Sequence, residues 1–140
     1  ALFAMDDSLL HAHHARRLVA RPGGGYPCRI SLTDAADGDT VILVNHEHLA
    51  VDTPYRSRHA IYVRAGEVRY DAVDRVPDQL RRRLLSLRAF DAVGMLVHAD
   101  VIPGQDLEVA IDRAFAHSRS DFLHLHYAQP GCYAARVDRA

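Results

Sequence analysis

The stretch that decides the fold lies near the C-terminus, where residues 122–137 read FLHLHYAQPGCYAARV. The segment 122–127 is rich in apolar and aromatic residues, as β-strands are. Gln129, Pro130 and Gly131 are residue types that favour a tight turn. The segment 132–137 is again largely apolar and follows this turn directly. The pattern therefore predicts a β-hairpin at the C-terminal end of the chain.

Outward from this hairpin, predicted strands are interspersed with predicted helices. Strands are expected over 28–33, 40–46, 59–64, 67–70 and 94–102, with 16–21 either a strand or the end of the first helix. Helices are expected over 9–15, over 77–90, where Leu80, Leu84 and Leu87 recur at helical spacing, and over 106–117. The segment 40–46 is apolar on both faces, which indicates a central strand, paired with 28–33. We expect an α+β fold with a mixed, mostly antiparallel sheet and two to three helices.

The chain has the composition of an ordinary globular protein, with 140 residues, 49% of them hydrophobic and 25% charged. This length fits one domain, so we expect residues 1–140 to form a single domain. All 17 basic residues are arginine, and 18 acidic residues bring the formal net charge to −1. A net charge near zero argues against a dedicated nucleic-acid-binding protein. The absence of lysine excludes the lysine of a P-loop or of a Schiff base.

The sequence also favours a cytoplasmic protein that does not enter a membrane. No run approaches the roughly 20 apolar residues of a membrane span, and no signal-peptide pattern is present. The two cysteines, Cys28 and Cys132, lie far apart and form no CxxC motif. We therefore expect two free thiols in a reducing compartment, with Cys28 in the core beside Ile30 and Leu32.

Two His-x-His pairs are the sharpest chemical feature of the chain. On a strand, residues i and i+2 point to the same face about 6.6 Å apart, so the two imidazoles of a pair can grip one metal ion. The pairs are His46 with His48 and His124 with His126. If the two strand ends are neighbours, they predict a site for a metal that accepts imidazole, zinc above all. The alternative is that these histidines line a polar sheet face or bond to loops.

Two weaker candidates involve a nucleophile and an anion site. Cys132 lies across the predicted hairpin from His124, and a histidine within reach could activate its thiol. A buried, inert cysteine is the alternative. The residues of the candidate anion site are Arg29, Tyr55, Arg56 and His59. Guanidinium groups bind carboxylate or phosphate bidentately, but structural salt bridges are the favoured explanation of these arginines.

These features leave two classes of function open. The first is a non-catalytic module that binds a small anionic ligand or a partner, for instance as a homodimer, and we expect this because no HExxH, GxSxG, GxGxxG or P-loop motif is present. The second is a metal-binding protein or small metal-dependent enzyme that uses the strand-borne histidines. Sequence patterns alone do not decide whether the protein is an enzyme.

Several short motifs together resemble one protein family. They are 26–29 (YPCR), 45–48 (NHEH), 54–56 (PYR), 60–64 (AIYVR), 84–91 (LLSLRAFD), 131–134 (GCYA) and 136–139 (RVDR). On these segments the chain resembles, over nearly its whole length, the bacterial domain-of-unknown-function family numbered 1203. The resemblance implies a small bacterial protein, and it assigns neither an activity nor a catalytic residue. It also implies a short additional segment, an extra first strand, before Ala1.

The resemblance narrows the candidate metal ligands. An aromatic residue often stands at the position of His46 in this family, and an asparagine at the position of Tyr127. These departures leave His48, His124 and His126 as the better set of three ligands.

Overall fold

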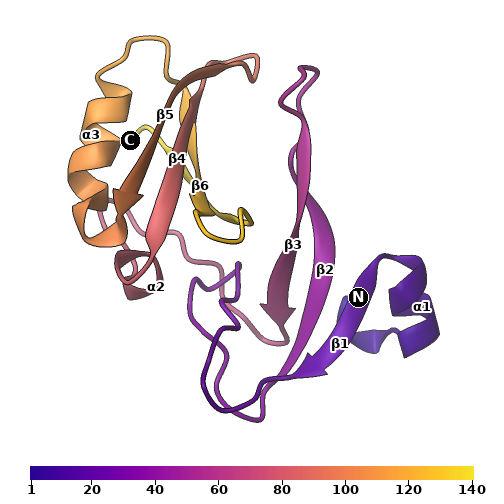
Figure 1. Ribbon diagram of the computed structural model, residues 1–140. Helices are drawn as coiled ribbons and strands as arrows, with labels where there is room; N and C mark the ends of the chain where they lie inside the picture. Colours follow the sequence, from indigo (N-terminus) through magenta and orange to yellow (C-terminus); the bar gives the residue numbers. More distant parts are fainter. The chain divides into compact units, whose positions relative to one another are not determined.

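The computed structural model describes residues 1–140, and its contacts divide the chain into two compact units. The first unit comprises Ala1–His46 and Ala60–Asp71, and the second comprises Glu47–His59 and Ala72–Ala140. One antiparallel sheet has three strands and the other has four (Figure 1). The predicted α+β class and the C-terminal hairpin are confirmed, although the strands form two sheets and not one. No helix has the length and apolar character needed to span a membrane.

The first unit is built around a three-stranded sheet in which β2 is the central strand. Its helix α1 begins after Asp6, whose Oδ1 accepts a hydrogen bond from the Leu9 amide at 2.8 Å. Val41 and Ile42 are both buried although they face opposite sides of β2, as predicted for a central strand. The elements are η1 (Leu2–Ala4), α1 (Asp7–Ala12), β1 (Ala15–Val19), β2 (Thr40–Leu49) and β3 (Ser57–Arg64), the last two of which also contribute residues to the second unit.

The predicted strand over 28–33 is wrong, because this segment forms a turn that one local hydrogen bond closes and that Ser31 ties to Glu67. The Cys28 amide donates to the Thr33 carbonyl at 3.1 Å, and Leu32 has a φ of 54°, which no strand residue adopts. The strand predicted over 67–70 is also absent, and the Glu67 carboxylate instead accepts from the Ser31 hydroxyl at 2.6 Å. The strand β2 therefore pairs with β1 and β3, and not with 28–33. Cys28 is buried in the core, as expected, but it packs with Ala35 and Val41, whereas Ile30 is 40% exposed because the segment is not a strand.

The second unit contains a four-stranded sheet in the order β5-β4-β6-β7. The helix α3 packs against β5 (Figure 1). The C-terminal hairpin pairs β6 with β7 and places Leu125 opposite Ala135. The elements are α2 (Asp78–Arg81), β4 (Leu84–Phe90), β5 (Leu96–Pro103), η2 (Gly104–Asp106), α3 (Leu107–Phe115), β6 (Phe122–Tyr127) and β7 (Tyr133–Asp138).

The helix predicted over 77–90 is wrong beyond its first turn. It ends at Arg81, and Leu84–Phe90 forms β4, the strand between β5 and β6. The leucines at 84 and 87 match a helical period, but the stretch LLSLRAF also alternates: Leu85, Leu87 and Ala89 are buried, whereas Leu84 is 54% exposed. Pairing with strands on both sides decides between the two periods, and this is a tertiary contribution that local spacing does not contain.

The two faces of this sheet differ in chemistry. Odd-numbered positions of β4 and β6 carry an apolar set, which includes Leu87, Leu123 and Leu125. Even-numbered positions carry the opposite face, where Arg88 lies directly across from His124. Every residue of β6 is buried, so this second face is covered as well. Two histidines are thereby placed in a buried position that strands usually fill with apolar side chains.

Candidate metal centre

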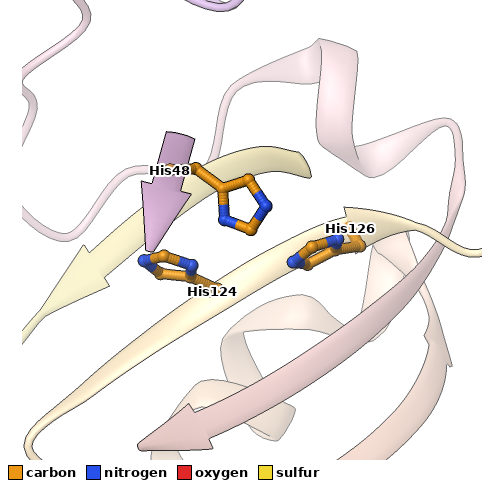
Figure 2. Close-up of side chains that lie close together, drawn as sticks. All are labelled: His48, His124 and His126. Carbon is orange, nitrogen blue, oxygen red and sulfur yellow. The ribbon is translucent and has the colours of Figure 1, made fainter. Parts of the chain in front are cut away.

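Three histidines of the second unit form a compact cluster. His124 and His126 lie on β6, and each is only 1% exposed. His48 lies near the end of β2 and is half-buried. One ring nitrogen from each residue lies within 4.8 Å of one ring nitrogen from each of the others. Figure 2 shows the rings of His124 and His126 on one strand, with the ring of His48 facing them.

The register of the sheet places His124 and His126 on a face with a defined set of neighbours. His124 lies opposite Arg88 on β4 and opposite Arg136 on β7. His126 lies opposite Tyr133 because the β6–β7 register shifts next to it. The His-x-His spacing therefore aims both rings to the same side, as the alternation of a strand requires.

The segment Glu47–His59 holds His48 in place through contacts with the core of the second unit. Leu49 is buried with Phe90 and Phe122, immediately after His48 in the chain. Two residues further on, Val51 packs on the same cluster. The hydroxyl of Thr53 then donates to the Gly94 carbonyl at 2.9 Å. These contacts fix the end of β2, so the His48 ring is positioned by packing rather than by a free loop.

Outer partners fix the orientation of two of the rings. Nδ1 of His126 donates to the Gly131 carbonyl at 2.9 Å, which leaves Nε2 with its lone pair. Nε2 of His48 lies 2.6 Å from Nδ1 of His59, so these two rings share a proton between a donor and an acceptor nitrogen. Histidines that bind metals almost always hold such an outer partner on the second nitrogen.

His124 carries an orphaned polar atom. Its Nδ1 is buried and has no hydrogen-bond partner. A buried nitrogen without a partner is costly, and most buried polar side-chain atoms in proteins have one. A metal ion coordinated by Nδ1 of this ring would relieve that cost.

The pKa values of the two buried rings on β6, His124 and His126, are lowered, so both rings are neutral at physiological pH. Burial, followed by the positive charges of His126, Arg136 and Arg88, lowers the pKa of His124 to about 3. Burial, together with Arg88 and His59, lowers the pKa of His126 to about 4 against the opposing hydrogen bond to Gly131. Burial and the charge of Arg88 also lower the pKa of His59. A metal ion would therefore not compete with protons for His124 and His126 near neutral pH.

Aromatic rings line the cluster. Tyr133 is parallel to His48, with ring centroids 4.6 Å apart. Phe90 and Phe122 lie against His124, with centroid distances of 5.6 and 5.4 Å. This lining lowers the local polarity around the imidazoles and limits their contact with water.

The four residues of the predicted anion site have separate surroundings. Arg29 belongs to the first unit, and its guanidinium donates to the Pro27 carbonyl. Arg56 pairs with Glu47, Nη2 to Oε1 at 3.1 Å, which matches the salt-bridge alternative. Tyr55 is 39% exposed and meets Phe90 edge-on. Of the four, only His59 contacts the histidine cluster, as the hydrogen-bond partner of His48.

Cys132 and His46 stand outside the cluster. Cys132 is a half-buried free thiol with no hydrogen bond to a histidine, and its role as a nucleophile stays a prediction. His46 is exposed and belongs to the first unit, so the second His-x-His pair contributes only His48.

Sequence reasoning missed Arg88 and Tyr133 as neighbours of the site. Arg88 was missed because the segment around it, 77–90, is predicted to be a helix and not a strand beside His124. The predicted hairpin placed Tyr133 on the strand that pairs with the strand of His126. The position directly opposite His126 follows only from the register shift. The spacing of Ser86, Arg88 and Phe90 at every second position would have predicted a strand with these three side chains on one face. This is the face that β4 shares with His124.

The comparisons with known proteins identify a family and no activity. No curated protein and no solved structure matches the chain. Residues 25–139 match the family described as "Protein of unknown function (DUF1203)". This match includes every residue of the histidine cluster and the whole four-stranded sheet, and the chain belongs to the DUF1203 family.

Proposed function

We propose that this protein binds one divalent transition-metal ion, with zinc as the best candidate, through His48, His124 and His126. The observation that carries the proposal is the convergence of three imidazole nitrogens within 4.8 Å in a buried, aromatic-lined setting. Imidazole suits zinc, copper, iron and nickel, and zinc accepts it without a geometric preference of its own.

The spacing of the ligand atoms is close to what zinc requires. With Zn–N bonds of about 2.0–2.1 Å, the nitrogens of a tetrahedral site lie about 3.3 Å apart. The three rings, all within 4.8 Å, thus need to approach by at most about 1.5 Å, which side-chain rotation supplies. The outer partners Gly131 and His59 and the neutral state of the rings favour the same assignment.

Three protein ligands leave a fourth position for water or for a ligand. Structural zinc sites are closed by four protein ligands, whereas sites that act on a bound molecule hold three and keep one position open. The cluster contains three histidines and no cysteine or carboxylate that would close it. The function that follows is the metal-dependent binding of a small molecule. It combines the two functions considered from the sequence, a ligand-binding module and a metal-binding protein.

Titration of tag-free protein with zinc, read by competition with a chromophoric chelator, tests the proposal. The wild type is expected to bind one equivalent. Because loss of an outer partner already costs about 10–100-fold in affinity, His48→Gln and His126→Gln should each cost at least about 100-fold. Binding of less than a tenth of an equivalent by the wild type would contradict the proposal.

A matched control comes from a second histidine pair in the same unit. His98 and His117 stack with centroids 5.1 Å apart but lie outside the cluster. His98→Gln and His117→Gln should bind zinc as the wild type does. Circular dichroism of each metal-free variant distinguishes loss of a metal ligand from loss of folding. Because His48 is half-buried, whereas His126 is fully buried, His48→Gln should disturb folding less than His126→Gln.

A homodimer, a bacterial source and a cytoplasmic location remain predictions of the sequence. Light scattering across a range of concentrations tests the dimer, and a strictly monomeric mass would count against it.

A further inference from the structure

Arg88 occupies an unusual position next to the histidine cluster. It lies on β4 directly opposite His124, on the sheet face that carries His124 and His126. The side chain is half-buried, and burial lowers the pKa of its guanidinium. Its charge acts on His59, His124 and His126, since it lowers the pKa of all three. The Arg88 guanidinium therefore influences both β6 ligands and His59, the outer partner of His48.

No carboxylate neutralises this guanidinium. Nε of Arg88 donates a hydrogen bond to the Ser86 hydroxyl at 3.4 Å. This bond is long, and its acceptor carries no charge. Arg136, on the other side of His124, differs: its Nε pairs with Asp138 Oδ1 at 2.8 Å and its guanidinium lies 4.1 Å above the Phe122 ring. A partly desolvated charge without a partner of opposite sign is costly. A bound anion would provide that partner.

The charge balance of the cluster points in the same direction. Its three candidate ligands are histidines, which bring no negative charge to a metal, so a divalent cation would keep its full charge beside the positive Arg88. An anion at the open metal position would offset both charges at once. The planar fork of arginine matches the two oxygens of a carboxylate, or of a phosphate, better than any other side chain does.

We propose that Arg88 binds the oxyanion group of a small ligand whose oxygen takes the open position of the metal held by His48, His124 and His126. The inference rests on the proposed function, because the metal holds one oxygen of the ligand and Arg88 holds another. It names the class of ligand: a small molecule that ends in a carboxylate or a phosphate. Arg136, already neutralised by Asp138, has no such role.

The test uses the cobalt-substituted protein, because the visible absorption of bound Co²⁺ responds to a change of its ligands. Sodium acetate and sodium sulfate are the two probes, and they stand for carboxylate and tetrahedral oxyanion ligands. Perchlorate keeps the ionic strength constant. The wild type should show a saturable change with at least one probe, and the probe that binds more tightly identifies the ligand class.

Three variants locate the anion. Arg88→Gln should weaken the binding of the better probe by about tenfold or more, the loss expected for one charge-assisted bidentate contact. The same variant should bind Co²⁺ as tightly as the wild type or more tightly, because a positive charge beside the cation is removed. Arg88→Lys should fall between the two, since it keeps the charge without the fork. Arg136→Gln is the matched control and should change probe binding by less than about threefold.

The outcomes separate the two proposals. Absence of cobalt absorption in the wild type would overturn the proposed function, and this inference with it. Cobalt absorption that does not respond to either probe, or that responds equally in Arg88→Gln, would overturn this inference alone. A parallel loss of cobalt and anion binding in Arg88→Gln would assign Arg88 a structural role and would also overturn it.

Discussion

Acidification of the metal-free protein from pH 6.5 to pH 4.5 should lower its free energy of unfolding by about 4 kcal/mol. The two buried histidines of β6 cause this loss. Their pKa values in the folded protein are about 3 for His124 and about 4 for His126, against 6.5 for an ordinary histidine. In this pH window the unfolded chain therefore binds two protons that the folded chain excludes.

The size and the sign follow from this difference in bound protons. Each excluded proton costs about 1.4 kcal/mol per pH unit, and partial protonation at the upper end of the window reduces the total for two protons to about 4 kcal/mol. The contribution of each ring to stability is present above pH 6.5 and is lost as the pH falls toward its folded pKa, about 4 for His126 and about 3 for His124. His59, whose pKa is also lowered, adds to the loss in the same direction.

Urea unfolding at several pH values between 7 and 4.5, followed by far-ultraviolet circular dichroism with a chelator present, measures this dependence. The double variant His124→Gln/His126→Gln should lose most of the slope, whereas His11→Gln/His13→Gln, altered at exposed positions of α1 and its C-terminal end, should keep it. A stability that stays constant between pH 6.5 and 4.5 would refute the burial argument. An unchanged slope in the first double variant would refute the assignment to β6.

Three further predictions concern the metal and the backbone. Zinc affinity should fall by no more than about tenfold between pH 7 and 5.5 in a competition assay, the loss that protonation of one histidine ligand can cause, because the two ligands on β6 are already neutral. A loss of about a hundredfold or more would show that protons compete for the ligands on β6 as well. Gly104→Ala should lower the free energy of unfolding, measured in urea, by more than about 3 kcal/mol. The reason is that a Cβ at this position would lie 1.8 Å from the Leu80 carbonyl oxygen. A loss below about 1 kcal/mol would contradict this close packing. Gly94→Ala places a Cβ 2.6 Å from Cβ of Val51, in the segment that carries the β2 histidine, and should weaken zinc binding by about tenfold or more. Gly38→Ala, which has a similar positive φ but open space, is its control and should bind zinc as the wild type does.

The C-terminal hairpin and the pairing of His124 with His126 could be predicted from the sequence. A strand period of two places both rings on one face whatever the rest of the fold does. The approach of His48 could be raised only as a hypothesis, because it depends on Leu49 packing with Phe90 and Phe122 across more than 40 residues of chain. Local spacing contains no information about such a contact.

The errors arose where two periods fit the same residues. The segment 77–90 satisfies a helical period through its leucines and a strand period through Leu85, Leu87 and Ala89, and pairing with β5 and β6 decides for the strand. This error also concealed Arg88. The segment 28–33 alternates as a strand would, but hydrogen bonds from Ser31 to Glu67 stabilise a turn there. In both segments long-range partners override the local pattern.

X-ray absorption spectroscopy of the zinc-bound protein tests the central claim most directly, because it reports the atoms around the metal. We expect one zinc with three imidazole nitrogens at about 2.0–2.1 Å and one further oxygen, and loss of one imidazole from this shell in His48→Gln. A shell with sulfur at about 2.3 Å, with fewer than three imidazoles, or unchanged by His48→Gln would contradict it.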